Sequence, residues 1–385
     1  MKTLIRIGFV IACSVWIAVA WKTYRQQHRP PPVVKVELMP FDETIPAWDG
    51  SYPVLAITTQ TSCSGQPKFT GAIVMKKPTV LHPAPVNEFD VNLDSGMFVL
   101  RQTDLFVPDL MPLALDRTYS VWDYNSRAFG AGTNHPYDIC PTGTRFPYTY
   151  MDLNLEDGRQ MYFPRISKGT GYADAVFRHG NTASEFYGAQ IAWNGDGWTL
   201  NFSDHRQIIF PEAYYSKNYA QGAAWEMRDG QGHSIHLKRD AARNLQELVS
   251  PSGHVIRFKY DGAARITEAE DDTGNTRTYT YNSTGHLESV SDGSRVLYRF
   301  EYTRLLNSAG YDPYLMTAIM NGNWNILLKN IYRAGLVSEQ HLADGKVYKY
   351  NYSRNSKNQI VQTIVTLPGG QTRPFNFQDG IYTER

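Results

Sequence analysis

A repeat of 21 residues in the second half of the chain constrains its fold more than any other sequence feature. Tyr260, Tyr281 and Tyr302 lie 21 residues apart, and each closes a short run with aromatic residues at alternate positions. Alternation with a period of two is typical of a β-strand, because successive side chains point to opposite faces of a sheet. Turn sequences rich in Gly, Asn and Asp separate these runs. The pattern predicts an array of hairpins in which each unit buries its apolar face against its neighbours.

The composition agrees with β structure and limits the partners. Of the 385 residues, 13% are aromatic and only 19% are charged. A chain of this length can form two or three domains, or one array with a separate head, and can bury a sizeable core. The 38 basic and 37 acidic residues give a net charge of +1, without a polybasic run. We therefore expect no nucleic-acid partner, which would need a basic face.

Residues 1–28 have the pattern of a signal anchor or a signal peptide. Basic residues precede an uncharged apolar run over residues 7–21, whose length lies between a signal-peptide core and a full membrane span. Ala18 and Ala20 suit cleavage by a signal peptidase, whereas Trp21 and the basic residues that follow favour an uncleaved anchor. Both alternatives export the body of the protein to the periplasm or the extracellular space. The body is then either held by the membrane through residues 7–21 or secreted.

Residues 29–85 form a Pro-rich linker with an irregular β lead-in, and no helix is expected there. Outside the apolar segment, Cys63 and Cys140 are the only two cysteines. Export places them in an oxidising compartment, where they could form one disulfide. The alternative is two separate buried thiols, because spacing in the sequence does not measure the distance between them.

Residues 86–165 are predicted to form a β head domain. Gly96 makes a turn and residues 97–102 form a strand. A break rich in proline covers residues 108–112, and alternation over residues 113–119 predicts a second strand.

A hairpin is predicted over residues 148–163, with an Asp-Gly turn at Asp157. Residues 166–224 are predicted to hold an insertion and connecting strands, with the insertion in the polar stretch over residues 167–194. The hairpin repeats then occupy residues 225–385.

Two sets of residues resemble the RHS/YD-repeat family. The head carries Asn-Leu-x-x-Gly, Thr-Asp, Pro-Leu-x-Leu-x-Arg-Thr-Tyr and Phe-Gly-x-Gly, which are similar to the domain that precedes the repeats in that family. Thr133 stands where the family usually has Trp. The matching head residues are Asn92, Gly96, Thr103, Asp104, Pro112, Leu113, Leu115, Arg117, Thr118, Tyr119, Phe129, Gly130 and Gly132. The matching repeat residues are Tyr260, Asp261, Gly274, Tyr281 and Tyr302.

The resemblance implies a sheet that winds into part of a hollow shell. In the family such shells enclose a polypeptide cargo, and the few units of this chain imply only a partial RHS-type shell. Its open edges would have to be capped or paired with a partner. The Asp-Pro-x-Gly pair that the family uses for self-cleavage is absent, since Asp312-Pro313 is followed by Tyr314. We therefore expect a short member of the family without a C-terminal toxin.

We expect no catalytic, cofactor-binding or metal-binding residue. His233 and His236 are three apart in a strand, so they project to opposite faces and cannot chelate one ion together. His233 and His254 occupy equivalent repeat positions where Asn275 is the third member, which indicates a role in turns. The adjacent carboxylates that begin at Asp271 are typical of a solvated turn. The sequence also contains no G-x-S-x-G, H-E-x-x-H, phosphate-binding loop or C-x-x-C.

The aromatic ladder favours packing within the sheet, although exposed tyrosine rows can also stack on sugars. The expected fold is therefore mainly β, with an N-terminal transmembrane or signal helix, a β head domain and an antiparallel sheet of YD-like hairpins. The leading hypothesis is a non-enzymatic, exported cell-envelope scaffold or binding protein that contacts a polypeptide or a polysaccharide through its repeat sheet. The alternative is a partial shell or remnant of an RHS polymorphic toxin system. A weaker alternative is a glycan-active enzyme centred on residues 167–194.

Overall fold

The computed structural model describes residues 90–121, 123, 125–180, 184–213, 219–304, 314–378 and 381–383. The expected N-terminal membrane segment, the Pro-rich linker and Cys63 lie outside these residues. Within the described part of the chain, none of the helices has the length and apolar character needed to cross a membrane.

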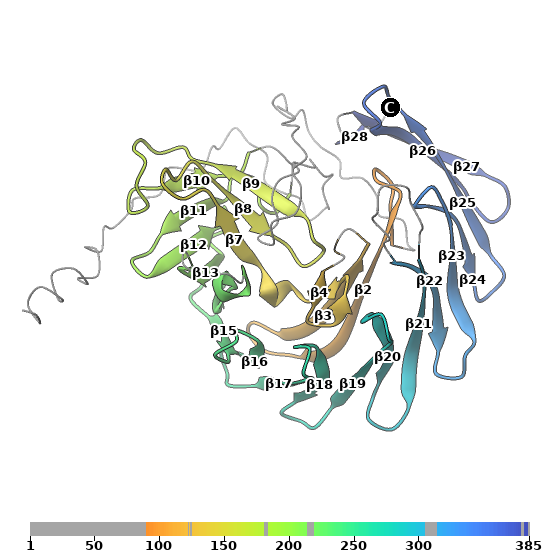
Figure 1. The fold of residues 1–385 in the computed structure, drawn as a ribbon, viewed down its shortest axis with the longest axis horizontal. Helices are drawn as coiled ribbons and strands as arrows, with labels where there is room; N and C mark the ends of the chain where they lie inside the picture. The colour runs from red at the N-terminus through yellow and green to blue at the C-terminus, as the bar shows by residue number, and fades with distance from the viewer. Residues whose placement is uncertain are drawn as a thin grey trace, which may run out of the picture.

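A single antiparallel sheet of nineteen strands dominates the structure, and each strand pairs with the next one along the chain. The sheet curves around the strands of the head (Figure 1). The predicted array of antiparallel hairpins is confirmed. The strands before the strict repeats are β10 (Val176–Arg178), β11 (Gln190–Trp193), β12 (Gly197–Asn201), β13 (Gln207–Pro211) and β14 (Glu226–Arg228). The repeats comprise β15 (Ser234–Arg239), β16 (Leu245–Val249), β17 (Val255–Tyr260), β18 (Ile266–Asp271), β19 (Thr276–Tyr281), β20 (Leu287–Ser291) and β21 (Val296–Arg304). The last strands are β22 (Tyr314–Asn321), β23 (Ile326–Arg333), β24 (Leu336–Leu342), β25 (Val347–Arg354), β26 (Ile360–Thr366), β27 (Thr372–Gln378) and β28 (Ile381–Thr383).

The repeat strands bend at the same place in every unit. The pairing register shifts just before Tyr260, Tyr281 and Tyr302, the three tyrosines that lie 21 residues apart. Such a β-bulge adds one residue to one strand, bends it and increases the local twist. A bulge repeated every 21 residues therefore accounts for the curvature of the sheet.

The residue after each repeat tyrosine closes the following turn. The Asp261 carboxylate accepts hydrogen bonds from the backbone amides of Ala263 and Arg265, both at 2.9 Å. Asn282 occupies the same position in the next unit and accepts from the equivalent amides. A side-chain oxygen that accepts hydrogen bonds from the backbone amides two and four residues ahead ends the strand pairing and stabilises a turn. This is the physical role of the Asp in the Tyr-Asp dipeptide.

The head consists of three smaller sheets: β1-β2-β3-β6, β4-β5 and β7-β8-β9. The predicted break over residues 108–112 separates its two long strands, although the first continues to Val107 and is longer than expected. The predicted hairpin with its turn at Asp157 is also present, as β8 and β9. The head strands are β1 (Val91–Asn92), β2 (Met97–Val107), β3 (Leu113–Ser120), β4 (Ser126–Arg127), β5 (Gly130–Ala131), β6 (Thr133–Asn134), β7 (Cys140–Gly143), β8 (Tyr150–Asn154) and β9 (Gln160–Pro164). Two short 3₁₀ helices are η1 (Pro136–Asp138) and η2 (Tyr219–Gly222).

The long sheet begins earlier than residue 225, where the repeats were expected to start. Strands β10 and β11 lie within residues 167–194, the stretch expected to be an insertion, and they form the first hairpin of the sheet. Phe177 and Ile191 face each other in this hairpin and are fully buried. The few apolar residues of a polar stretch are thus enough to place it in the sheet.

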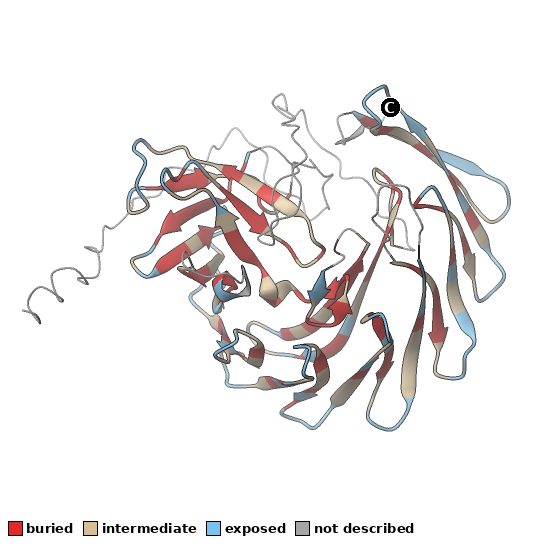
Figure 2. Ribbon diagram, in the orientation of Figure 1, coloured by how far each residue is buried: buried red, intermediate tan, exposed pale blue. Residues whose placement is uncertain are grey.

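The head lies in the concavity of the sheet and is bonded to it along its length. The Ile266 amide donates to the Ala128 carbonyl at 2.7 Å. Further along, the Val337 amide donates to the Gly96 carbonyl at 2.9 Å. Buried positions gather in the head strands and recur in the strands of the sheet (Figure 2). One continuous hydrophobic cluster extends from Val91 to Phe377, so the head and the repeats share a core.

Candidate functional site

The head residues that resemble the RHS/YD family form the contact with the repeats. A buried ion pair joins Arg117 Nε to Asp104 Oδ2 at 2.9 Å, and the Tyr279 hydroxyl donates to the same carboxylate at 3.0 Å. Burial alone would lower the pKa of Arg117, but the Asp104 carboxylate outweighs it and holds that pKa above its usual value. Asp104 of β2 thus meets an aromatic residue of the sheet, and so does Arg117 of β3, which lies over the Phe300 ring.

Other motif residues make the same kind of contact. The Tyr119 hydroxyl accepts a hydrogen bond from the Met316 amide at 3.0 Å, and its ring lies 5.9 Å from that of Tyr302. The Phe129 ring lies 4.8 Å from that of Tyr279. The remaining motif residues are placed around these contacts: Leu113 and Leu115 are fully buried, Thr118 pairs with Asn134, Thr103 donates to Asp116, and Pro112 precedes β3.

The motif glycines lie where a side chain has no room. Gly96 donates its amide to the Asn92 carbonyl at 2.7 Å in the turn before β2. At Gly130 φ is +83°, and a Cβ would collide with the Gly285 carbonyl oxygen. Gly132 adopts φ +72°, and there too a Cβ would meet backbone atoms. Close approach of the head backbone to the sheet therefore requires glycine at Gly130, whereas Gly132 lies against the backbone of Ser120 and Asp123 within the head.

The ladder tyrosines support the strands beside them. The Tyr260 hydroxyl donates to the Leu245 carbonyl at 2.7 Å, and the Tyr281 hydroxyl donates to the Ile266 carbonyl at 2.5 Å. Tyr302 holds the equivalent position, but its buried hydroxyl has no hydrogen-bond partner among the described residues. The rings of the ladder pack inside the molecule, which is the first of the two alternatives for their role.

Residues around Thr133 hold polar atoms inside the head. Thr133, in place of the Trp of the family, is fully buried, and its Oγ1 has no hydrogen-bond partner in the described part of the chain. His135 is also fully buried, and burial lowers its pKa. Neither of its ring nitrogens makes a hydrogen bond within the described residues.

His233 and His254 each lie beside a single aspartate, and Cys140 is buried in the head. His233 Nδ1 lies 2.6 Å from Asp229 in a turn, and His254 Nδ1 lies 2.7 Å from Asp272. No group of three His, Cys, Asp or Glu residues that could hold a metal occurs in the described ranges. Cys140 is buried in β7, where its Sγ lies 3.7 Å from Asn154 Nδ2. Its disulfide with Cys63 stays a prediction.

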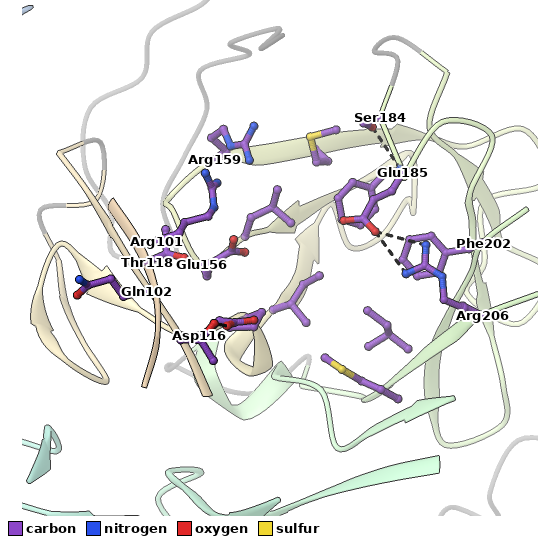
Figure 3. Close-up of a pocket in the computed structure, with 18 residues that line it drawn as sticks. Arg101, Gln102, Asp116, Thr118, Glu156, Arg159, Ser184, Glu185, Phe202 and Arg206 are labelled. Atoms are coloured by element: carbon purple, nitrogen blue, oxygen red, sulfur yellow. Dashed lines mark hydrogen bonds and ion pairs between the residues drawn. The ribbon is translucent and has the colours of Figure 1, made fainter. Parts of the chain in front are cut away.

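A cavity of about 430 Å³ opens between the head and the start of the sheet, and we call it the hairpin pocket. Hairpin β2-β3, hairpin β8-β9 and strands β12 to β14 contribute to its wall (Figure 3). Its apolar part consists of Ile139, Leu155, Met161, Phe186, Phe202, Ile208 and Met227. Its size and mixed lining suit a ligand site, since such sites combine apolar walls with a few polar groups.

Charged residues lie on two sides of the hairpin pocket. Arg101, Glu156 and Arg159 lie on one side, and Glu185 and Arg206 lie on the other (Figure 3). Arg206 contacts Glu185 at 3.4 Å and stacks on the Phe202 ring.

Asp157, in the turn of β8-β9, positions the first side of the pocket. Its buried carboxylate accepts from Arg159 Nε at 2.5 Å and lies 3.4 Å from Arg101. Burial and the neighbouring Asp157 carboxylate raise the pKa of Glu156. The pocket thus offers guanidinium donors and one carboxyl group whose proton is held more tightly than usual.

Apart from Thr103 and Thr118 of the head motif, the residues of this pocket were not singled out from the sequence. They come from seven separate segments, so no single local motif contains them. Asp157 was recognised only as a turn residue, although an Asp-Gly turn flanked by Arg159 is a signal for an ion pair. No contact with the head was expected for Arg239 either. It replaces the repeat tyrosine, and its guanidinium donates to Asp138 at 2.9 Å and to the Tyr137 carbonyl at 2.5 Å.

Comparison with known proteins gives one family match and several weak structural likenesses. No curated protein matches the chain. The crystal structure of TcdB2-TccC3-TEV aligns with 72% of this chain at 10% identity and a TM-score of 0.24, and the chain spans 19% of that chain. The crystal structure of TcdB2-TccC3 aligns with 70% at 12% identity and a TM-score of 0.27, and 17% of that chain is covered. A porin-like protein from Bacteroides uniformis aligns with 74% of this chain and 91% of its own at 10% identity and a TM-score of 0.20. Residues 90–163, which form most of the head, match the family described as Domain of unknown function (DUF6531).

Proposed function

We propose that this chain is a non-enzymatic, exported cell-envelope scaffold or binding protein of the RHS/YD type. Two findings support the family assignment. The family match over residues 90–163 falls on the segment whose motifs resemble the head of RHS/YD proteins. The Tyr and Asp of the Tyr-Asp dipeptides also have separate, recurring roles in the sheet.

The observation that carries the binding role is the difference between the two faces of the repeat sheet. The concave face is packed against the head through Asp104, Arg117 and Tyr279. The opposite face carries cross-strand ion pairs, such as Lys238 with Glu247 and Lys259 with Glu268.

These ion pairs are exposed and contribute little to stability, so this outer face is available to a polar partner. A polypeptide or an envelope polysaccharide would meet the protein there. A shell for a separate toxin would instead need a free concave face. In this chain the head covers the concave face from β17 to β24. The proposal of a binding scaffold is therefore favoured over that of a partial toxin shell.

Site-specific photo-crosslinking in intact cells tests this proposal. A photoreactive residue replaces Lys259, whose side chain is 70% exposed on the outer face. A control replaces Asp174, which lies between β9 and β10 and whose side chain is 56% exposed. The expected result is a discrete adduct from position 259 with one envelope polypeptide or with polysaccharide. Equal labelling from both positions, or none from position 259, contradicts a role for the repeat sheet. A soluble toxin as the sole adduct would favour the shell instead.

Export and anchoring are proposed on the sequence of residues 1–28 alone. Sequencing the N-terminus of the mature protein separates the two alternatives, because an anchored protein keeps residues 7–21 and a secreted one begins after Ala20. Protease added to intact spheroplasts should digest the body of an exported protein. Full protection of the body from this protease would contradict export.

One observation favours a second candidate, a glycan-active enzyme. Asp116, Glu156 and Glu185 line the hairpin pocket, and Glu185 comes from residues 167–194. Burial and the Asp157 carboxylate raise the pKa of Glu156, and glycosidic cleavage needs one carboxyl group that keeps its proton near a second carboxyl group. Turnover of envelope glycans by the purified protein, abolished in Glu156→Gln, would support this candidate. Turnover that Glu156→Gln leaves unchanged, or no turnover at all, would remove it.

A further inference from the structure

The outward face of the sheet β7-β8-β9 carries an acidic and aromatic cluster away from the hairpin pocket. In β8, Tyr150 and Asp152 point to one face, and Tyr162 pairs with Asp152 across the strand pair. Met151 and Phe163 point to the other face and are fully buried in the core. The alternation of strands thus places one carboxyl group and two phenol rings together on the side that faces away from the core.

Asp152 differs from every other buried aspartate of the described residues. Its side chain accepts no hydrogen bond in the described part of the chain, and only 9% of the residue is exposed. Burial raises its pKa to about 7, and no cation counteracts this. The other four are all bonded: Asp104 to Arg117, Asp123 to Arg127, Asp157 to Arg159, and Asp271 to Thr273 and Asn275.

A carboxylate that is largely buried and has no internal hydrogen bond is costly, because little water can reach it. The cost disappears when a ligand supplies the missing positive charge and hydrogen bonds. Asp152 forms part of no turn or contact between strands that would require a carboxyl group.

The two tyrosine rings beside Asp152 are suited to a cation. The rings of Tyr150 and Tyr162 lie 5.3 Å apart with an angle of 41° between their planes, and both residues are half-buried. Burial raises the pKa of both phenols, and the negative charge of Asp152 raises it further. The carboxylate therefore lies close to each ring. The electron-rich faces of two rings and a carboxylate together attract an ammonium or guanidinium group.

We propose that Tyr150, Asp152 and Tyr162 form a binding site for a lysine or arginine side chain of a partner polypeptide. A neutral sugar could stack on the rings, but it would leave the carboxylate charge without compensation. A cationic side chain satisfies all three residues at once. The choice of a polypeptide rests on the proposed function, whereas the affinity for the cation does not.

Small capped amino acids test the site without any partner. At pH 8.5, the resonances of ¹³C-labelled tyrosine rings are followed while Nα-acetyl-lysinamide or Nα-acetyl-argininamide is added. Nα-acetyl-norleucinamide serves as the uncharged control. Saturable shifts of Tyr150 and Tyr162 with at least one of the two cations, and not with norleucinamide, are expected. Binding should weaken about tenfold in Asp152→Asn and several-fold in Tyr150→Ala.

Asp204→Asn is the matched control, because its carboxylate is 54% exposed and lies on another hairpin. It should bind the cations as the natural protein does. Asp152→Asn should keep its fold, since no internal bond is removed, and circular dichroism checks this. Equal binding of norleucinamide, or unchanged binding in Asp152→Asn, overturns the proposal. Saturation by a neutral oligosaccharide in place of the cations assigns the face to polysaccharide and overturns it too. Failure of the crosslinking at Lys259 leaves this result unaffected, so the two proposals fail separately.

Discussion

Tyr281 lies at the end of β19, and its hydroxyl donates a hydrogen bond to the Ile266 carbonyl, 15 residues earlier on the neighbouring strand. Tyr260 and Tyr352 make the same bond, also over 15 residues. Tyr302 has the same place in its unit, but its buried hydroxyl has no partner in the described ranges. The same residue type at the same repeat position therefore makes a stabilising hydrogen bond in one unit and buries an unbonded hydroxyl in the next.

This difference predicts opposite effects of one substitution. Tyr281→Phe should lower the free energy of unfolding by about 1 kcal/mol, because it removes a hydrogen bond and leaves a buried carbonyl with one partner fewer. Tyr302→Phe should be neutral or stabilising, because it removes a hydroxyl that is buried without a partner. Urea unfolding of the two variants measures both values. A larger loss in Tyr302→Phe than in Tyr281→Phe would contradict the assignment of the hydroxyls.

Asp152 makes a second prediction at this scale, on pH. Its pKa in the folded protein, about 7, lies above its ordinary value of 3.8. A raised pKa means that the folded state binds the proton more tightly, so the contribution is favourable below about pH 4 and is lost as the pH rises through 7. Asp152→Asn should therefore be more stable than the natural protein at pH 8, by roughly 2 to 4 kcal/mol, and equal to it near pH 4.

Thermal unfolding of both proteins between pH 4 and pH 9 checks this prediction. Buried His179 and His286 have pKa values lowered to about 4, so protonation destabilises the fold as the pH falls from 6.5 toward 4. Both variants contain these histidines, so their effect cancels in the difference. A stability difference between the two proteins that does not change with pH would show that the pKa of Asp152 is not raised in the folded state.

At the scale of elements, glycine positions separate the steric role of the head–sheet contact from ordinary turn geometry. Gly130 in β5 and Gly274 in the turn between β18 and β19 have nearly equal φ values, +83° and +87°. A Cβ at Gly274 would meet open space, whereas one at Gly130 would collide with the Gly285 carbonyl. The two positions thus share a positive φ but differ in the space open to a side chain.

The paired substitutions measure that difference. Gly274→Ala should cost about 1 kcal/mol, the ordinary price of a side chain in the left-handed region. Gly130→Ala should cost about 3 kcal/mol or more, since the head and the sheet must also move apart. Chemical denaturation of both variants gives the comparison. Equal losses would mean that the head backbone does not approach the sheet at Gly285.

The elements also show what can be predicted from sequence. Strong alternation and turn residues predicted the repeat strands and the β8-β9 hairpin, because both signals are local. Phe177 and Ile191 were missed as strand residues, since two short strands in a polar stretch have no visible period. The hairpin pocket and the isolation of Asp152 could not be predicted, because they depend on which side chains of distant segments meet, or fail to meet, in three dimensions.

For the whole molecule, the buried pair of Arg117 and Asp104 lies in the head where it meets the repeats, because Asp104 also accepts a hydrogen bond from the Tyr279 hydroxyl. Arg117→Met should lower the free energy of unfolding by about 3 kcal/mol or more, because it leaves the Asp104 carboxylate buried without its cation. Arg228→Met is the control, since Arg228 is 42% exposed and pairs with Glu226 at 2.6 Å. It should cost less than about 1 kcal/mol. Equilibrium unfolding of both variants decides whether the pair is an essential part of the fold.

The head fills the concave face of the repeat sheet and forms one folded unit with it, which leaves the outer face for a partner. Hydrogen exchange of the intact chain tests this most directly. The amides of Ile266, Met316 and Val337 lie in the sheet but donate to acceptors in the head. They should exchange on the order of a thousand-fold more slowly than the amide of Ser283, an exposed turn residue, and as slowly as the core amides of the sheet. Rapid exchange at these three positions, with the other sheet amides still protected, would show that the head is not seated in the sheet and would contradict the account.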